Sequence, residues 1–252
     1  MAMHTDKGVI FHVLGDGPEA VLCHPSLGLG RFLFHRLQPR WSARYAVVSW
    51  DPRGVGDNRL LAPSLEAMVA DTEDIAAVLD RPVHLVGVSL GSFVMARVAA
   101  QTAGRIQTVA LVSTSVGFSD GAAMVAERAR RIESQGMVEY ARAYSQEVLT
   151  EFARPEVREN LAEELADMDP KTYLETMAFT YAVDNGPVFA QVQQPTLVVV
   201  GTLDQITPPA EAEIAARVLP NSWLAVVPRA GHLIPLDQPL RLDETLQEFW
   251  QA

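Results

Sequence analysis

A serine between two glycines is the clearest chemical signal in the sequence. Residues 87–91 read Gly-Val-Ser-Leu-Gly, and this G-x-S-x-G pattern follows an apolar run and opens a helical one. In that context it predicts a sharp strand-to-helix turn, because side chains in place of Gly87 and Gly91 would collide as the backbone reverses. Such a turn would present the hydroxyl of Ser89 as a nucleophile. The alternative is that Ser89 only caps the first turn of the helix.

A serine hydroxyl is a weak nucleophile until a base accepts its proton, and histidine is the usual base near neutral pH. The chain has six histidines. We favour His232 because it follows the last expected strand in a loop, from which its ring can reach back over the edge of the sheet. The alternative for His232 is an ordinary surface histidine.

The third member of such a site is an acid that fixes the imidazole tautomer and stabilises the imidazolium. Asp204 is our candidate, because it comes directly after an expected strand in the segment Gly-Thr-Leu-Asp. Its alternative role is to cap a turn or helix. Asp51, at the end of an earlier strand, is a competing carboxylate that we rank second, because Pro52 and Gly54 suit a turn there.

Acyl transfer also needs donors for the oxyanion that develops on the substrate carbonyl. The N–H of Leu90, the residue after the nucleophile, is one candidate donor. The second is expected from the loop after residues 20–24, where we nominate the N–H of Ser26 with Leu27 as its neighbour. Pro25 is excluded, since it has no N–H. Alternatively this loop is only a flexible connector.

The elements that must position these residues follow from hydrophobic patterning. Short β-branched runs alternate with helical patterns, which is typical of an α/β fold with a mostly parallel sheet and helices on both faces. Between 114 and 190 the alternation stops, and three or four helices are expected. We therefore expect a core of residues 1–113 and 191–252 and a helical cap of residues 114–190 inserted between two strands. The expected strands are 9–13, 20–24, 45–50, 83–88, 108–113, 196–200 and 223–227; the expected helices outside the cap are 31–37, 65–79, 90–101, 209–219 and 240–250.

Composition excludes other classes of protein. Against 20 Lys and Arg stand 31 Asp and Glu, a net charge of −11 that argues against a nucleic-acid partner. The cap segment holds 14 acidic and 7 basic residues, which we interpret as a solvated outer face rather than a surface that selects partners. No apolar run is long enough to cross a membrane, and the first residues lack a secretory pattern, so we expect a cytoplasmic protein. The single cysteine, Cys23, offers neither an internal disulfide nor a metal cluster.

These segments resemble the α/β-hydrolase superfamily. The order Ser89, Asp204, His232 is the one expected for that fold. The resemblance implies the α/β-hydrolase fold, with those three residues as the catalytic set and Ser26 and Leu90 as oxyanion donors. The segments that carry it are HPSLG at 24–28, DPRGVGD at 51–57, GVSLG at 87–91, GTLD at 201–204 and AGH at 230–232.

Within the superfamily the Pro-Ser-Leu-Gly loop and the size of the cap resemble 3-oxoadipate enol-lactonase and related small esterases. Two departures leave the substrate open: His24-Pro25 stands where His-Gly is usual, and Leu90 stands where Met or Gly is common. A serine at position 89 argues against dehalogenases and epoxide hydrolases, which use a carboxylate there. The larger lipases carry a His-Gly-Gly-Gly loop that this sequence lacks.

The sequence thus predicts a serine hydrolase for a small or medium carboxylic ester or lactone, with no metal or organic cofactor. A thioesterase, a non-hydrolytic enzyme on the same site (a lyase, cyclase or perhydrolase) and a receptor on a hydrolase scaffold remain as alternatives. A cap above the serine makes an apolar acyl or ring site plausible, although each such side chain is more often packing. Arg31, Arg53 and Arg128 are candidates to meet a substrate carboxylate, with a surface or structural role as the alternative. The candidate substrate-binding residues are Leu27, Met124, Tyr140, Tyr144 and Phe179.

Overall fold

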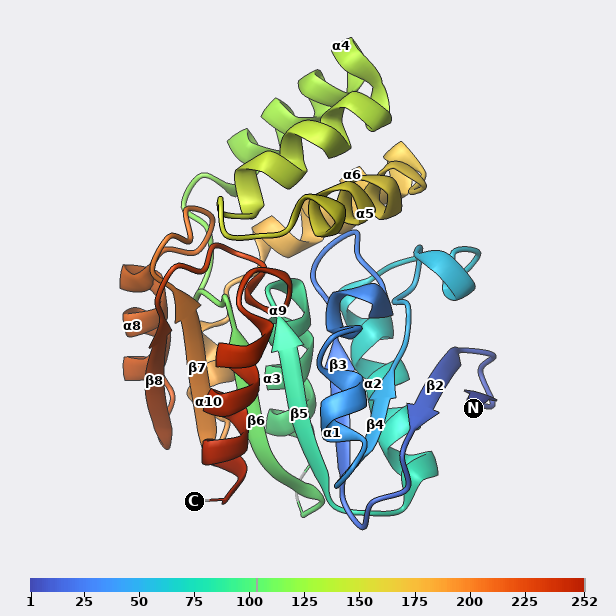
Figure 1. The fold of residues 1–252 in the computed structure, drawn as a ribbon, viewed down its shortest axis with the longest axis vertical. Helices are drawn as coiled ribbons and strands as arrows, with labels where there is room; N and C mark the ends of the chain where they lie inside the picture. The colour runs from blue at the N-terminus through green and yellow to red at the C-terminus, as the bar shows by residue number, and fades with distance from the viewer. Residues whose placement is uncertain (103, 252) are drawn as a thin grey trace.

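One eight-stranded sheet forms the centre of the molecule (Figure 1). The computed structural model describes residues 1–102 and 104–251. The strand order is β1-β2-β4-β3-β5-β6-β7-β8, and the six strands from β4 to β8 in that order run parallel. The expected α/β class with a mostly parallel sheet is confirmed. The strands are β1 (Ala2–His4), β2 (Ile10–Leu14), β3 (Ala20–His24), β4 (Ala46–Ser49), β5 (Val83–Val88), β6 (Ile106–Val112), β7 (Thr196–Gly201) and β8 (Ser222–Val227).

The central strands are apolar because both faces of the sheet are covered. Every residue of β3, β4, β5 and β7 is buried, as expected for parallel strands between two helical layers. The short strand β1, which pairs antiparallel with β2 at the edge of the sheet, was not expected from the sequence. Its three residues are mostly exposed and carry no apolar run.

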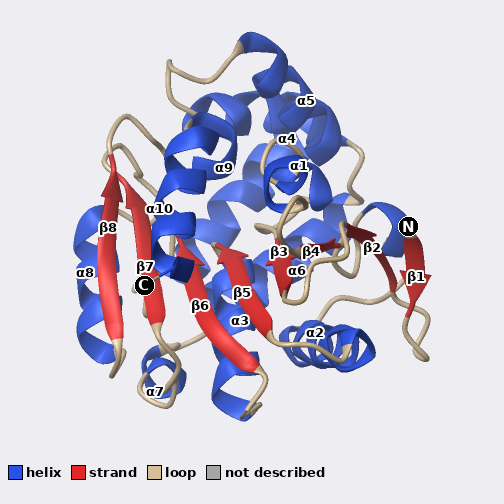
Figure 2. Cartoon of the chain, turned by 60° about the horizontal axis from the view of Figure 1, so that its bottom comes forward, coloured by secondary structure: helices blue, strands red, loops and turns tan. Residues whose placement is uncertain are grey.

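Helices cover the two faces of the sheet in separate groups (Figure 2). One face carries α2, α3 and α8, and the other carries α1 and α10. The bounds of α2 and α3 match the expected helices, and Ser64 caps α2 by accepting the N–H of Ala67, as its position suggested. The elements outside the cap are η1 (Arg31–Phe34), α1 (Gln38–Trp41), η2 (Gly56–Asn58), α2 (Leu65–Leu79), α3 (Leu90–Gln101), α8 (Pro209–Val218), α9 (Ile234–Asp237) and α10 (Pro239–Gln251).

The insertion between β6 and β7 is helical, as expected. It contains α4 (Gly121–Val148), α5 (Pro155–Ala166), α6 (Pro170–Ala182) and α7 (Gly186–Phe189). The first three lie over the carboxyl ends of the parallel strands (Figure 1), while α7 packs against α3 and α8. The long helix α4 is kinked at Gly136, whose φ of 81° is non-helical. The helices α4, α5 and α6, which we call the cap helices, therefore cover the carboxyl-terminal edge of the parallel sheet.

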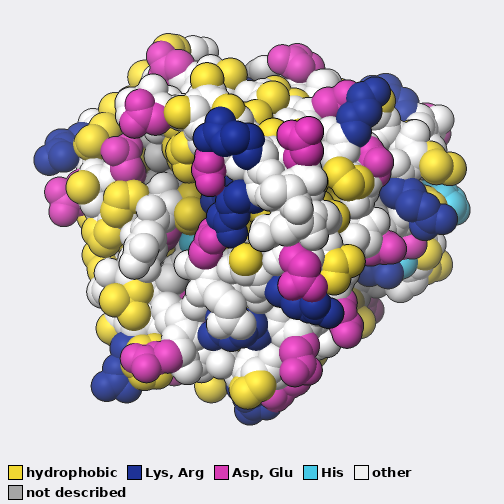
Figure 3. All heavy atoms as spheres, turned by 90° about the horizontal axis from the view of Figure 1, so that it is seen from above, with side chains coloured by type: hydrophobic (Ala, Val, Ile, Leu, Met, Phe, Trp, Pro, Cys, Tyr) yellow, Lys and Arg dark blue, Asp and Glu magenta, His cyan; other side chains and the backbone are white. Residues whose placement is uncertain are grey.

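The outer surface of the cap helices carries both signs of charge (Figure 3). Acidic and basic side chains alternate there, and several form pairs one helical turn apart, such as Glu127 with Arg130 and Lys171 with Glu175. Exposed pairs of this kind suit a solvated surface and contribute little to stability. Among the described residues, no helix combines the length and the hydropathy required to cross a bilayer.

Candidate active site

Ser89 sits at the turn between β5 and α3 in a strained backbone conformation. Its φ and ψ are 53° and −115°, a region that non-glycine residues rarely adopt and that costs on the order of 1–3 kcal/mol. The side chain makes no capping hydrogen bond to α3, so the alternative of a simple capping serine is wrong. The backbone conformation is instead that of a sharp strand-to-helix reversal, and the Ser89 hydroxyl makes no hydrogen bond to any of the described residues.

The two glycines that frame Ser89 are needed for close backbone approach. A Cβ on Gly87 would lie 2.2 Å from the carbonyl oxygen of Gly91, and a Cβ on Gly91 would lie 2.2 Å from that of His24. The turn is fixed on both sides by hydrogen bonds: Ser89 N–H donates to Val112 O at 2.9 Å, and Ser92 N–H donates to Ser89 O at 2.8 Å. The start of α3 is thereby pressed against the end of β3.

His232 and Asp204 form a buried pair. The His232 Nδ1 lies 2.9 Å from Asp204 Oδ2 and 3.1 Å from Oδ1, and each residue is only 3% exposed. Because Nδ1 donates to the carboxylate, the ring presents Nε2 as the nitrogen available to accept a proton. This is the orientation expected of a general base held by an acid.

The Asp204 carboxylate is held in its charged form by its surroundings. It accepts the N–H groups of Ile206 and Thr207 at 2.9 and 3.0 Å and the Thr207 hydroxyl at 2.9 Å. Burial by itself raises the pKa of Asp204, but the charge and hydrogen bond of His232, together with the Thr207 donors, hold it below its ordinary value. Thr207 is thus a supporting residue that the sequence reasoning missed.

The loops bearing Ser89 and His232 are neighbours at the carboxyl edge of the sheet. Val112, whose carbonyl accepts the Ser89 N–H, is followed by Ser113, and the Ser113 hydroxyl donates to the His232 carbonyl at 2.7 Å. Adjacent strands lie about 4.8 Å apart, so the two loops are within side-chain reach of each other. No hydrogen bond joins the Ser89 hydroxyl to the His232 ring in the described residues, a contact that often tightens only with substrate bound.

The loop after β3 lies beside the start of α3. Ser26 and Leu27 are 2% and 7% exposed, and Leu29 N–H donates to Ser26 O at 3.1 Å to close a turn. Neither the Ser26 N–H nor the Leu90 N–H donates a hydrogen bond within the part of the chain that the structure describes. Since Gly91 packs on His24 and Pro25, these two free N–H groups belong to segments in direct contact.

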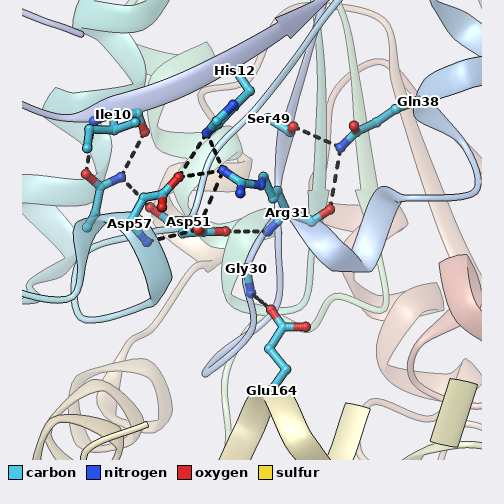
Figure 4. A network of polar contacts seen from close by, with 10 residues as sticks. Ile10, His12, Gly30, Arg31, Gln38, Ser49, Asp51, Asp57 and Glu164 are labelled. Atoms are coloured by element: carbon cyan, nitrogen blue, oxygen red, sulfur yellow. Dashed lines mark hydrogen bonds and ion pairs between the residues drawn. The ribbon is translucent and has the colours of Figure 1, made fainter. Parts of the chain in front are cut away.

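Asp51, the competing carboxylate, organises a different loop. It accepts the backbone N–H of Arg31 at 2.8 Å and that of Asp57 at 3.1 Å (Figure 4). Its carbonyl accepts the Asn58 side-chain amide at 2.7 Å. These contacts are to η1 and the η2 turn, and the partner of His232 is Asp204.

All three arginines that were candidates for a substrate carboxylate already have a carboxylate partner. Arg53 makes two hydrogen bonds to Asp71, at 2.6 and 2.8 Å, and Arg31 binds Asp57 at 2.6 Å. Arg128 is 7% exposed; its Nη1 lies 3.8 Å from Glu147 Oε2 and donates to the Tyr140 hydroxyl at 2.7 Å.

Tyrosines of the cap helices form a cluster above the Ser26 loop. The hydroxyls of Tyr140 and Tyr173 are hydrogen-bonded at 2.8 Å, and the rings of Tyr140 and Tyr144 stack at 6.1 Å. A Cβ on Gly28 would lie 2.9 Å from the Tyr173 ring, so the cluster reaches down to the loop. Tyr173 was not among the residues selected from the sequence.

The other candidate substrate-binding residues occupy separate positions. Met124 lines a cavity of about 170 Å³ together with Ser115 and Ile206, close to the segment that joins β6 and α4. Phe179 is half-buried and packs against the hydrophobic core. Leu27 lies in the loop after β3, below the tyrosine cluster.

Known proteins share this architecture over nearly the whole chain. The model of the alpha/beta hydrolase family matches residues 20–245. The pimeloyl-[acyl-carrier protein] methyl ester esterase of Aeromonas hydrophila is 25% identical over 93% of this chain and 96% of its own. The 3-oxoadipate enol-lactonase 1 of Acinetobacter baylyi is 23% identical, over 96% and 94%. The crystal structure of the enol-lactonase from Burkholderia xenovorans LB400 has the same fold, with a TM-score of 0.88 at 22% identity and 100% of both chains covered.

Proposed function

This chain belongs to the alpha/beta hydrolase family, and we propose that it is a serine hydrolase that cleaves small or medium carboxylic esters or lactones through an acyl-enzyme on Ser89. The observation that carries the proposal is the buried Asp204–His232 pair, with its 2.9 Å contact, at the ends of β7 and β8, while the strained serine turn ends β5 and only β6 lies between β5 and β7. The relatives named for ester and lactone substrates support the same reaction class.

In acylation Ser89 is the nucleophile and His232 is the general base. The Ser89 hydroxyl attacks the substrate carbonyl while His232 Nε2 takes its proton, so an Oγ–C bond forms and the carbonyl electrons move to oxygen. The N–H groups of Ser26 and Leu90 stabilise that oxyanion, and each such donor is worth on the order of 3 kcal/mol in the transition state. Asp204 stabilises the imidazolium. The ester bond then breaks, and His232 returns the proton to the leaving alkoxide.

Deacylation repeats the sequence with water. His232 accepts a proton from a water molecule, which attacks the acyl-enzyme, and the same two N–H groups stabilise the second oxyanion. Collapse releases the carboxylic acid and returns the proton to Ser89. In a lactone the leaving alkoxide stays attached to the acyl group, so the product is a single hydroxy acid.

We place the acyl or ring moiety of the substrate beneath the cap helices. We assign the contact with this moiety to Leu27 and the rings of Tyr140 and Tyr144, whereas Met124 and Phe179 occupy separate positions. Pockets of this kind hold ligands by apolar contact and use few polar groups for orientation.

Labelling and turnover test the proposal together. A fluorophosphonate probe is expected to label the wild-type protein on Ser89, and p-nitrophenyl acetate is expected to turn over. Ser89→Ala should lose both while its melting temperature stays nearly unchanged, whereas Ser134→Ala, at an exposed serine of α4, should retain both. Retained activity in Ser89→Ala would exclude the assignment, and labelling without any turnover would favour a non-hydrolytic reaction. A parallel screen of chromogenic esters, aliphatic lactones and acyl thioesters identifies the substrate class.

A further inference from the structure

A carboxylate of the cap reaches across to the loop after β3. Glu164, on α5, accepts the backbone N–H of Gly30 through Oε1 at 2.6 Å (Figure 4). The two residues are 134 positions apart in the chain. Gly30 directly follows the turn closed by Leu29 N–H and Ser26 O, so the Glu164 contact lies at the end of the segment that carries the Ser26 N–H.

Gly30 is enclosed by two carboxylates from different layers. A Cβ on Gly30 would lie 2.2 Å from Asp51 Oδ1 and 3.0 Å from Glu164 Oε1. Asp51 also accepts the next backbone N–H, that of Arg31, at 2.8 Å. Two successive N–H groups of the loop are therefore bound by one carboxylate from the core and one from the cap. No residue other than glycine fits between them without displacing one of the carboxylates.

The Glu164 carboxylate is only partly satisfied. Its Oε2 is buried and has no hydrogen-bond partner in the described residues. Burial raises the pKa of Glu164 to about 7, the Asp51 charge adds to the rise, and the Gly30 N–H and Arg31 oppose it. Two small cavities flank this carboxylate. Their other titratable or charged lining residues are Asp51, Arg59, Asp167 and Asp169 on one side and Arg31, His35 and Asp51 on the other.

We propose that Glu164 is a positioning residue: through the Gly30 N–H it ties the cap helices to the loop after β3 and so holds the Ser26 N–H in place for the oxyanion. This inference rests on the proposed function. The 2.6 Å bond needs only an acceptor oxygen on residue 164, and hydrogen bonds of this length prefer a nearly linear geometry that fixes the direction of the Gly30 N–H. The turn between Ser26 and Leu29 connects Gly30 to the Ser26 N–H. When Glu164 on α5 fixes Gly30, the Ser26 N–H is therefore fixed as well.

Two substitutions separate the hydrogen bond from the packing of the side chain. Glu164→Gln keeps an acceptor oxygen on a side chain of the same length, whereas Glu164→Ala removes the acceptor. Glu163→Ala, at the exposed neighbouring position on α5, is the matched control. We expect Glu164→Ala to lower kcat for p-nitrophenyl acetate by roughly tenfold with a smaller effect on KM. Glu164→Gln should recover most of that loss, and Glu163→Ala should behave as wild type.

A transition-state mimic distinguishes positioning from a general loss of structure. A boronic acid inhibitor, which forms a tetrahedral adduct with the serine, should bind Glu164→Ala more weakly by about the factor lost in kcat. A kcat for Glu164→Ala equal to that of Glu163→Ala, or no recovery in Glu164→Gln, would overturn the proposal. An equal loss in substrate and inhibitor binding, with kcat unchanged, would also overturn it.

The Gly30 amide gives a readout that needs no catalysis. In ¹⁵N-glycine-labelled wild-type protein, we expect the Gly30 signal to move with pH near neutrality and its hydrogen exchange to be slow. The pH response should disappear in Glu164→Gln, and both features should disappear in Glu164→Ala. If Gly30 responds in this way but wild type neither reacts with the fluorophosphonate nor turns over ester, the serine-hydrolase proposal fails while the contact itself is real. If the pH response and the slow hydrogen exchange of the Gly30 amide persist in Glu164→Ala, the positioning role is wrong whatever the activity.

Discussion

The Asp237 carboxylate accepts the N–H of Gly231, the residue before His232, at 2.7 Å. The same carboxylate accepts the Thr150 N–H at 3.0 Å, and Thr150 lies just after the end of α4. His232 itself donates its backbone N–H to Val148 O at 3.2 Å. Asp237 therefore fixes the loop that carries His232, the candidate general base, to the segment that follows α4.

Removing this carboxylate should disturb the site as well as the fold. Asp237→Ala leaves the Gly231 and Thr150 N–H groups without their buried acceptor, which costs about 1–3 kcal/mol each when no water replaces it. We expect a lower melting temperature and a loss of esterase kcat/KM of roughly tenfold or more, because the His232 ring is no longer held in position. Thermal unfolding and steady-state kinetics measure both. Asp6→Ala, at an exposed aspartate, is the control, and an Asp237→Ala protein that loses stability but keeps full kcat/KM would show that Asp237 does not position His232.

The roles of Asp204 and Asp51 can be distinguished by replacing each of them with asparagine. Asp204→Asn should lower kcat by roughly a thousandfold or more, because an amide stabilises neither the required His232 tautomer nor the imidazolium. Asp51→Asn should have a far smaller effect, since its acceptor oxygens serve Arg31 and Asp57 N–H groups. The measurement is kcat for p-nitrophenyl acetate at neutral pH. The reverse ranking would reassign the acid to Asp51.

A substitution at Gly91 should lower both stability and activity, because the start of α3 lies very close to the His24 carbonyl there. Gly91→Ala places a methyl group 2.2 Å from the His24 carbonyl oxygen, so α3 has to move away from the end of β3. We expect a loss of about 2 kcal/mol in the free energy of unfolding, with a fall in kcat as the Leu90 and Ser26 N–H groups separate. Urea unfolding and kinetics test this. Gly186→Ala is the control, because an added Cβ there meets only the Asp184 carboxylate at 3.2 Å.

Local patterns were sufficient for the main elements and for the turn at Ser89. Strand ends, glycine spacing and the order of motifs are short-range signals, so β3, β5 and the serine turn could be expected at their observed positions. The cap helices were expected for the same reason, since a long stretch without β-branched runs predicts helices. The edge strand β1 was missed because its pairing with β2, not its own composition, makes it a strand.

The residues that the sequence did not reveal act over long distances in the chain. Glu164 is one of several acidic residues on α5, and only its contact with Gly30 distinguishes it from the exposed Glu163. Asp237 likewise has no motif, because its partners are backbone N–H groups of two separate loops. Tyr173 also belongs to no motif, and its ring meets Gly28 only because the cap helices fold back over the loop after β3. Such contacts depend on how the cap helices sit on the sheet, which residue types and spacing do not determine.

The raised pKa of Glu164 predicts how stability changes with pH. Its folded-state pKa of about 7 lies above its ordinary value of 4.5, so between these values the native protein holds a proton that the unfolded chain has released. Stability then falls as pH rises across this window, because ∂ΔG/∂pH follows the difference in bound protons between unfolded and native states. The contribution is fully present below pH 4.5 and is lost as pH passes 7.

Glu164→Gln should remove this part of the pH dependence, because the amide stays neutral while it keeps an acceptor for Gly30. We expect the melting temperature of the variant relative to wild type to rise between about pH 5 and pH 8, whereas the same difference for Glu163→Gln stays constant. Differential scanning calorimetry of the three proteins across this range gives the comparison, with the other titrating groups common to all of them. A difference for Glu164→Gln that does not change with pH would mean that Glu164 titrates near its ordinary value and is not held in a buried, proton-retaining site beside Asp51.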